Sequence, residues 1–189
     1  MTDHQRDSDL STSTRPESQD ERALILVALA GGGWHRELYR IIERMPAERF
    51  RFAYAYSHYC GNHSVKRLPM PHAGRRYPLR SLGQTRQHPW RHVTNIGRFL
   101  AAFVESAILV RRLNPCAILG VAHSSAIPLL TAARLWGKRG VFIESITRIS
   151  KLSRSGRIIY HLRLATDMYV QWPQLVTKYS RARFAGSSI

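Results

Sequence analysis

Three consecutive glycines stand where backbone groups could bind phosphate. Gly31, Gly32 and Gly33 follow an apolar run at 23–30 and precede a helical pattern at 34–44. A turn without side chains lets the backbone approach a diphosphate closely, and the helix N-terminus favours negative charge there. The turn lacks the third glycine of a dinucleotide-binding fingerprint, and the chain has no GK[ST] phosphate loop. We therefore expect neither a nicotinamide or flavin cofactor nor ATP hydrolysis. A tight structural turn is the alternative interpretation.

A histidine and two serines lie beside the ends of predicted strands. His35 closely follows the glycine turn, where an imidazole could act as a general base or as a diphosphate ligand, and a polar surface role is the alternative. Ser124 and Ser125 connect a predicted strand to the next helix. They are suited to capping that helix, to contacting a ligand, or to both. His123, beside them, is a secondary candidate.

A carboxylate and a guanidinium follow another predicted strand, at 141–144. Glu144 ends this apolar run, and Ser145 and Arg148 come soon after it. Ligands of open α/β sheets bind in the crevice at the carboxyl ends of the strands. We therefore expect these three side chains to line such a crevice, with an internal ion pair to Arg148 as the alternative.

The elements that would position these residues alternate along the chain. We predict an α/β fold, a Rossmann-like parallel sheet with helices on both faces, over 23–189, preceded by a disordered polar tail at 1–22. Residues 57–92, rich in proline, arginine and histidine, are predicted to form a long basic loop with one short strand at 65–68. Strands are expected at 23–30, 50–56, 116–120, 141–144, 167–171 and 183–185, and helices at 34–44, 95–113, 124–136, 155–165 and 173–179.

Basic residues dominate the charge of the chain. Lys and Arg total 29 against 12 Asp and Glu, which gives a formal net charge of +17. This excess implies an anionic partner: nucleic acid, an anionic membrane surface or a phosphorylated substrate. The segment 66–112 concentrates the charge around the predicted amphipathic helix 95–113. That helix would either pack its apolar stripe into the core or lay it on a membrane. No apolar run is long enough for a spanning helix.

One segment, 141–175, combines several residues at fixed spacings. They are Glu144-Ser145, Arg148, Leu152-Ser153, Ser155-Gly156, Tyr160, Asp167 and Gln171-Trp172-Pro173. With these features the segment closely resembles the acceptor-side subunit of the split N-acetylglucosaminyltransferase of dolichol-linked oligosaccharide synthesis, and equally the bacterial relatives of that subunit in exopolysaccharide and capsule operons. A weaker match at the glycine turn, followed by Glu37 and Leu38, extends the resemblance over 23–189.

The resemblance implies a division of labour between two chains. The family resembles the N-terminal half of a GT-B glycosyltransferase of the MurG type, and a separate donor-binding subunit supplies the C-terminal half and binds the UDP-sugar. This chain would hold a polyprenyl-diphosphate-linked saccharide during an inverting sugar transfer, with no metal or cofactor of its own. It would be peripheral, on the cytoplasmic face of the membrane, and would recruit its partner there. The segment with Gln171, Trp172 and Pro173 would dock the partner.

Two positions depart from the family pattern. Trp34 takes the place of a histidine directly after the glycines, and His123-Ser124 replaces a Pro-Gly pair. Both changes lie where the acceptor diphosphate would bind.

Two rival functions remain open beside this one. The first rival is a basic nucleic-acid-binding protein, but no nucleic-acid module or aromatic stacking pattern is recognisable, so we expect no nucleic-acid partner. The second is a non-catalytic scaffold that only brings an enzyme to the membrane.

Overall fold

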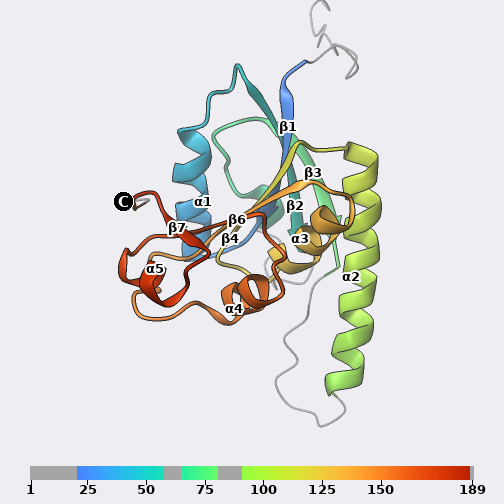
Figure 1. Cartoon of the computed structure of the whole chain (residues 1–189). Helices are drawn as coiled ribbons and strands as arrows, with labels where there is room; N and C mark the ends of the chain where they lie inside the picture. Colours follow the sequence, from blue (N-terminus) through green and yellow to red (C-terminus); the bar gives the residue numbers. More distant parts are fainter. Residues whose placement is uncertain (1–20, 58–64, 81–90, 188–189) are drawn as a thin grey trace, which may run out of the picture.

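The structure is a seven-stranded parallel sheet in the order β3-β2-β1-β4-β5-β6-β7 (Figure 1). It is a computed structural model and describes residues 21–57, 65–80 and 91–187, so the predicted tail 1–22 lies almost entirely outside the described residues. The order of strands reverses between β1 and β4, which is the arrangement of a Rossmann-like domain and confirms the predicted fold class. The strands are β1 (Ala23–Leu29), β2 (Phe50–Ser57), β3 (Gly74–Leu79), β4 (Ala117–Val121), β5 (Arg139–Ile143), β6 (Asp167–Val170) and β7 (Ala182–Phe184).

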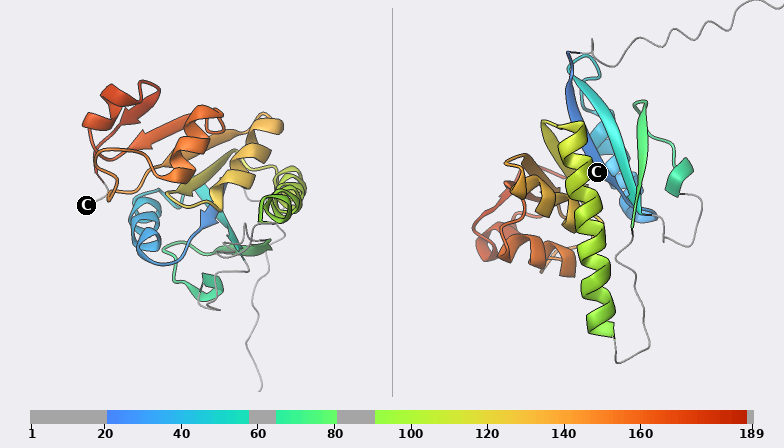
Figure 2. Two further views of the ribbon diagram at one scale, coloured as in Figure 1. Left: turned by 90° about the horizontal axis from the view of Figure 1, so that it is seen from below. Right: turned by 90° about the vertical axis from the view of Figure 1, so that its right-hand side faces the viewer.

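Helices cover both faces of the sheet, so the central strands are buried on both sides (Figure 2). In β1, Val27 faces the cluster formed with α1 (Gly33–Glu43), whereas Leu26 and Ala28 face the cluster that includes α3 (Ala126–Leu135). This alternation explains why the strand reads as a continuous apolar run rather than as alternating polar and apolar residues. The remaining helices are α2 (Arg91–Leu113), α4 (Arg154–His161) and α5 (Gln174–Lys178), and each adds residues to the cluster that includes α3.

The structure corrects the prediction for 57–92. Within this segment β3 pairs with β2 as an edge strand, and a 3-10 turn, η2 (Val65–Arg67), stands where a short strand was expected. An edge strand needs little apolar sequence and tolerates Pro78, because one side of its ladder is unpaired. Gly74 allows the close pairing, since an added Cβ would lie 2.2 Å from the Phe52 carbonyl oxygen. The rest of the predicted loop, 58–64 and 81–90, lies outside the described residues.

Candidate functional site

A cleft of about 690 Å³ opens at the carboxyl edge of the sheet, beside the point where the strand order reverses. Trp34 from the start of α1 lines it, together with His123 and Ser124 from the turn between β4 and α3. No carboxylate is among its described lining residues, whereas four cationic side chains from the loop after β5 and from α4 are. These are Arg148, Lys151, Arg154 and Arg157. The cleft is therefore suited to an anionic ligand that bears several negative charges.

The glycine turn lies beside this cleft, and only one of its glycines is required by backbone conformation. Gly32 has φ of 72° and ψ of −147°, a region that residues with a side chain rarely enter. A Cβ added to Gly32 or Gly33 would meet no atom within 4 Å, so the turn is open to a ligand. Gly31 is closer packed, because its Cβ would lie 3.3 Å from the Val65 side chain.

The histidine that reaches the cleft is His123, not His35. His35 Nε2 lies 2.9 Å from the Pro69 carbonyl oxygen, and His35 is absent from the lining of the cleft. Trp34, one residue earlier, instead places its ring 5.1 Å from the His123 ring at an angle of 54°. The predicted direct role for His35 does not fit this geometry, because its ring is directed to the segment before β3.

Hydrogen bonds and burial define the state of His123. The Ser125 amide donates to His123 Nδ1 at 3.2 Å, and Ser125 Oγ lies 3.0 Å from the same nitrogen. Burial lowers the pKa of His123 below its ordinary value of 6.5. The ring is therefore neutral at pH 7, and the proton must lie on Nε2, because Nδ1 accepts. His123 thus offers one N–H donor to a ligand.

The two serines before α3 do not cap it with their side chains. Ser125 occupies the N-cap position of α3 without a side-chain capping bond, and its hydroxyl faces His123 instead. Ser124 lines the cleft, and its hydroxyl has no hydrogen-bond partner among the described residues. In the turn between β4 and α3, Ala122 adopts a left-handed backbone conformation, with φ of 48°, that is strained for a residue with a side chain. Of the two predictions for these serines, contact with a ligand fits the geometry better than capping.

Glu144 is fully buried, which corrects the prediction that it lines the crevice. Its carboxylate accepts from the Ser145 amide at 3.0 Å, and from the Ser153 amide and hydroxyl at 2.9 Å each. Burial raises the pKa of Glu144, while these hydrogen bonds and the nearby Arg148 charge oppose the shift. Arg148 itself faces the cleft. Glu144 therefore fixes the loop that carries the cations, and it cannot touch a ligand in the cleft.

Ser153 and Gly156 explain the serine-glycine pattern at the start of α4. Ser153 is the N-cap of α4, and its hydroxyl accepts from the Gly156 amide while donating to Glu144. A Cβ on Gly156 would lie 2.0 Å from Glu144 Oε2, so only glycine fits. The buried cluster of Glu144, Ser153 and Gly156 sets the direction in which Arg154 and Arg157 leave α4.

A second carboxylate, Glu37, joins α1 to the loops after β5 and β6. Ser145 Oγ donates to Glu37 Oε1 at 2.7 Å, and Gln171 Nε2 and the Ile146 amide donate to Oε2 at 3.0 and 3.2 Å. Ser145, predicted to bind the acceptor, is therefore buried in this network. The network crosses the reversal of the strand order and holds the two halves of the sheet together at the edge where the cleft opens.

The residues predicted to dock a partner make contacts within the chain. Gln171 is buried and also donates to the Glu144 carbonyl at 3.0 Å. Trp172 Nε1 donates to the Ile146 carbonyl at 2.5 Å. Of this set Pro173 alone is exposed, at the start of α5. The side chains of Gln171 and Trp172 thus stabilise the loop after β5 and are not free for a partner.

The sequence assigned no role to Glu37, which entered only through the family resemblance, or to three of the cations. Glu37 lies four residues before Ile41, so helical periodicity would have placed it on the half-buried side of α1. Lys151, Arg154 and Arg157 follow Arg148 at intervals of three, a regular spacing of positive charge that marks the loop and helix of the cleft. The described residues contain no group of three His, Cys, Asp or Glu that could hold a metal ion.

Comparison with known proteins places this geometry in a family. A family model described as "Oligosaccharide biosynthesis protein Alg14 like" matches residues 25–188. The UDP-N-acetylglucosamine transferase subunit ALG14 of Rattus norvegicus is 27% identical over 187 residues, which cover 87% of this chain and 83% of the relative. The Candida albicans protein of the same name is 25% identical over 199 residues and covers 94% and 84%.

Solved structures agree with the fold. Acinetobacter baumannii MurG matches with a TM-score of 0.63 at 15% identity, over 88% of this chain and 45% of MurG. A UDP-N-acetylglucosamine 2-epimerase from Rickettsia bellii matches with a TM-score of 0.61 at 10% identity, over 88% and 45%. This chain therefore spans about half the length of those proteins and shares the fold of one half. Together with the family match, which confirms the resemblance found in the sequence, this shows that the chain belongs to the Alg14-like family of oligosaccharide biosynthesis proteins.

Proposed function

We propose that this chain is the acceptor-binding subunit of a two-component inverting glycosyltransferase. The enzyme would transfer a sugar from a UDP-sugar to a polyprenyl-diphosphate-linked saccharide. The observation that carries the proposal is the cation-lined cleft at the carboxyl edge of the sheet, where the order of strands reverses. The names of the Rattus and Candida relatives support a transferase subunit and favour UDP-N-acetylglucosamine as the donor.

The chemistry of the cleft suits a diphosphate. The guanidinium forks of Arg148 and Arg154 would bind phosphate oxygens in pairs, and the positive end of the α3 dipole would favour the negative charge. His123 Nε2–H and the Ser124 hydroxyl would donate to further oxygens. Glu144 and Glu37 would act as positioning residues, because they hold the loops that carry these groups and do not reach the cleft.

A separate donor-binding subunit would complete the site. The chain covers 45% of MurG, and the proposal assigns the donor-binding half to a partner chain that closes over the same edge of the sheet. Sugar transfer would then require both chains.

Helix α2 supplies the surface that would bring this subunit to a membrane. Its outward face carries apolar side chains at intervals of four residues, which are between 52% and 62% exposed: Ile96, Leu100, Val104 and Ile108. Arg98, Arg111 and Arg112 flank this stripe and are exposed. Apolar anchors beside cations fit the surface of an anionic bilayer. Among the described residues no helix is long and apolar enough to cross the bilayer.

The proposal is tested by co-expressing this chain with a candidate donor-binding partner. Membranes from these cells are assayed for transfer from UDP-N-acetylglucosamine and other UDP-sugars to a polyprenyl-diphosphate-linked saccharide. We expect transfer only when both chains are present. Arg154→Ala should lower transfer about tenfold or more, because one charge-assisted hydrogen bond contributes about 1.5–3 kcal/mol.

Two controls separate this function from the scaffold. Arg44→Ala, at the end of α1 and outside the cleft, removes the same charge and should leave transfer unchanged. Co-purification of the partner shows whether each variant still assembles. If Arg154→Ala and Arg148→Ala both assemble and both keep full transfer, the cleft does not hold the acceptor and the chain acts as a scaffold.

A further inference from the structure

A second cleft, of about 410 Å³, lies at the opposite edge of the sheet, where β6 and β7 begin. Three arginines from three separate elements line it: Arg134 at the end of α3, Arg163 in the turn between α4 and β6, and Arg181 before β7. The remaining lining residues are apolar or carry a hydroxyl group, and no carboxylate is among them. The second cleft is therefore positively charged, and it shares no lining residue with the basic cleft at the carboxyl edge.

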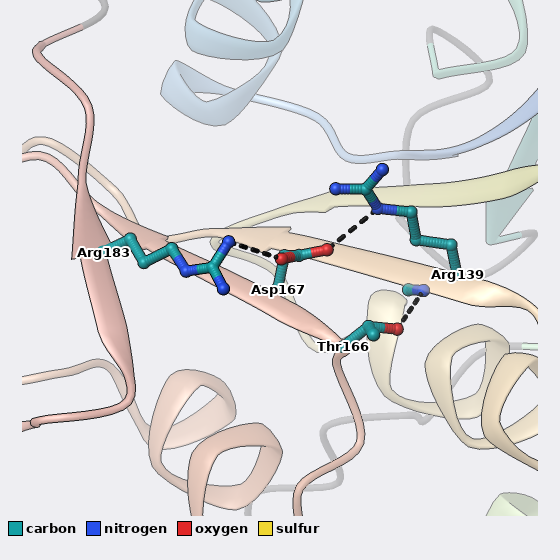
Figure 3. Close-up of polar contacts among 5 residues, drawn as sticks. Arg139, Thr166, Asp167 and Arg183 are labelled. Atoms are coloured by element: carbon teal, nitrogen blue, oxygen red, sulfur yellow. Dashed lines mark hydrogen bonds and ion pairs between the residues drawn. The ribbon is translucent and has the colours of Figure 1, made fainter.

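Asp167, which lies between the lining residues Thr166 and Met168 in the sequence, does not neutralise this second cleft. Asp167, at the start of β6, lies between Arg139 and Arg183, with ion-pair distances of 2.9 and 3.0 Å (Figure 3). Thr166, the preceding residue, lines the cleft. Its hydroxyl oxygen accepts from the Gly140 amide at 2.9 Å, on the side away from the Asp167 carboxylate (Figure 3), so its own O–H remains a donor. Successive side chains of a strand alternate between the faces of a sheet. The Asp167 carboxylate is thus paired with Arg139 and Arg183 on the face away from the three arginines of the cleft.

Arg163 stands at a position that favours glycine. The Arg163 amide donates to the Tyr160 carbonyl at 3.3 Å, and the Leu164 amide donates to the Ile159 carbonyl at 3.0 Å. These two bonds form the Schellman motif that ends α4, and they place Arg163 at the residue that takes a left-handed conformation, with φ of 53°. Its guanidinium has no hydrogen bond or ion pair to any described residue. An arginine here costs backbone strain, which no hydrogen bond or ion pair with the described residues offsets.

The other two arginines are held in place by the chain. Arg134 donates to the Arg163 carbonyl at 2.5 Å. Arg181 donates to the Tyr160 carbonyl at 2.7 Å and lies 4.2 Å from the centre of the Tyr160 ring. These bonds satisfy carbonyls at the end of α4, which would otherwise repel an anion, and they leave other N–H groups of both guanidiniums to face the cleft.

We propose that this second cleft binds a phosphate group. Three guanidinium forks around one cavity match the several oxygens and the charge of a phosphate ester, and Thr166 adds a hydroxyl. Leu135 and Trp136 follow Arg134 directly and are exposed, so the phosphate could come from a lipid headgroup or from a soluble phosphate. The proposal does not depend on sugar transfer, because it concerns residues outside the carboxyl-edge cleft.

The test uses the full chain labelled with nitrogen-15 and titrated with pyrophosphate. Amide signals of Leu164 and Thr166 report on the second cleft, and those of Ser153 and Ser155 report on the carboxyl-edge cleft. We expect saturable shifts at Leu164 and Thr166. In Arg163→Gly, the apparent affinity measured at these signals should fall about tenfold while the melting temperature does not fall, because glycine relieves the left-handed strain. Arg44→Ala is the matched charge control and should bind like the wild type.

The outcomes separate the phosphate source and decide the proposal. Short-chain dihexanoyl phosphatidylglycerol, kept monomeric so that α2 meets no bilayer, would indicate a lipid headgroup if it displaces pyrophosphate from the second cleft, and failure to displace it would indicate a soluble phosphate. Either result supports the site. Shifts that never saturate, or an affinity that Arg163→Gly leaves unchanged, would overturn it. Signals from Ser153 and Ser155 report on the carboxyl-edge cleft independently, so a lack of binding at one cleft does not imply a lack of binding at the other.

Discussion

At the scale of single residues, the clearest constraint is the space around Gly156. A methyl group there would collide with the buried Glu144 carboxylate and crowd the Ser153 hydroxyl. We predict that Gly156→Ala lowers the free energy of unfolding by about 1–3 kcal/mol, as overpacking of a buried site does. Urea unfolding measures the change.

Gly97 in α2 provides the matched control for Gly156. A Cβ added at Gly97 meets nothing within 4 Å. Gly97→Ala should therefore raise the stability by about 0.5–1 kcal/mol, because alanine is the better helix former. Equal effects of the two substitutions would contradict the role given to the cluster of Glu144, Ser153 and Gly156.

Glu144 also predicts a pH dependence of stability. Burial raises its pKa in the folded chain above the ordinary value of 4.5, so the folded state holds this proton more tightly than the unfolded state does. The contribution of Glu144 to stability is therefore greatest at acid pH, and it falls as pH rises from 4.5 through the raised pKa.

The measurement for Glu144 is a series of urea unfolding curves from pH 4 upward for the wild type and Glu144→Gln. The glutamine does not titrate. The difference in the free energy of unfolding, wild type minus variant, should therefore shrink as pH rises through this window. A difference that grows with pH would show that the three hydrogen bonds outweigh burial and lower the pKa instead.

At the scale of elements, apolar patterning was enough to predict the buried strands but not β3. β1 and β4 are buried on both faces, so their sequences are apolar throughout and recognisable. β3 has Arg75, Arg76 and Pro78 because it pairs on one side only, and its sequence resembles a loop. The boundaries of the helices were predicted closely, except that α2 begins at Arg91 rather than near residue 95, and that α4 ends at His161 rather than at residue 165.

The exposed stripe of α2 gives the prediction at this scale. Ile108→Gln should weaken binding to vesicles that contain phosphatidylglycerol by about tenfold, since inserting one large aliphatic side chain contributes about 1.5 kcal/mol. The melting temperature should not change, because Ile108 is exposed. Vesicle sedimentation measures the binding. Phe184→Gln on β7, where the phenylalanine is also exposed and lines neither cleft, should leave vesicle binding unaltered; a similar loss would argue against α2 as the membrane surface.

At the scale of the whole molecule, the site was only partly predictable because it is assembled from distant segments. The glycine turn, Ser124 and Arg148 were recognisable, since each follows a predicted strand whose carboxyl end must lie at one edge. Sequence could not show that Glu144 points inward, nor that Glu37 reaches the loops after β5 and β6. Those directions depend on side-chain packing across elements that lie 108 and 134 residues apart in the chain.

The proposed division between two chains makes a kinetic prediction about the complete enzyme. The four cations of the carboxyl-edge cleft belong to this subunit, and the donor would bind its partner. In the reconstituted complex, Arg157→Ala should raise KM for the polyprenyl-diphosphate acceptor about tenfold and leave KM for the UDP-sugar unchanged. Steady-state kinetics with each substrate varied in turn measures both constants. A rise in KM for the donor instead would mean that the cleft faces the UDP-sugar, and it would reverse the roles assigned to the two subunits.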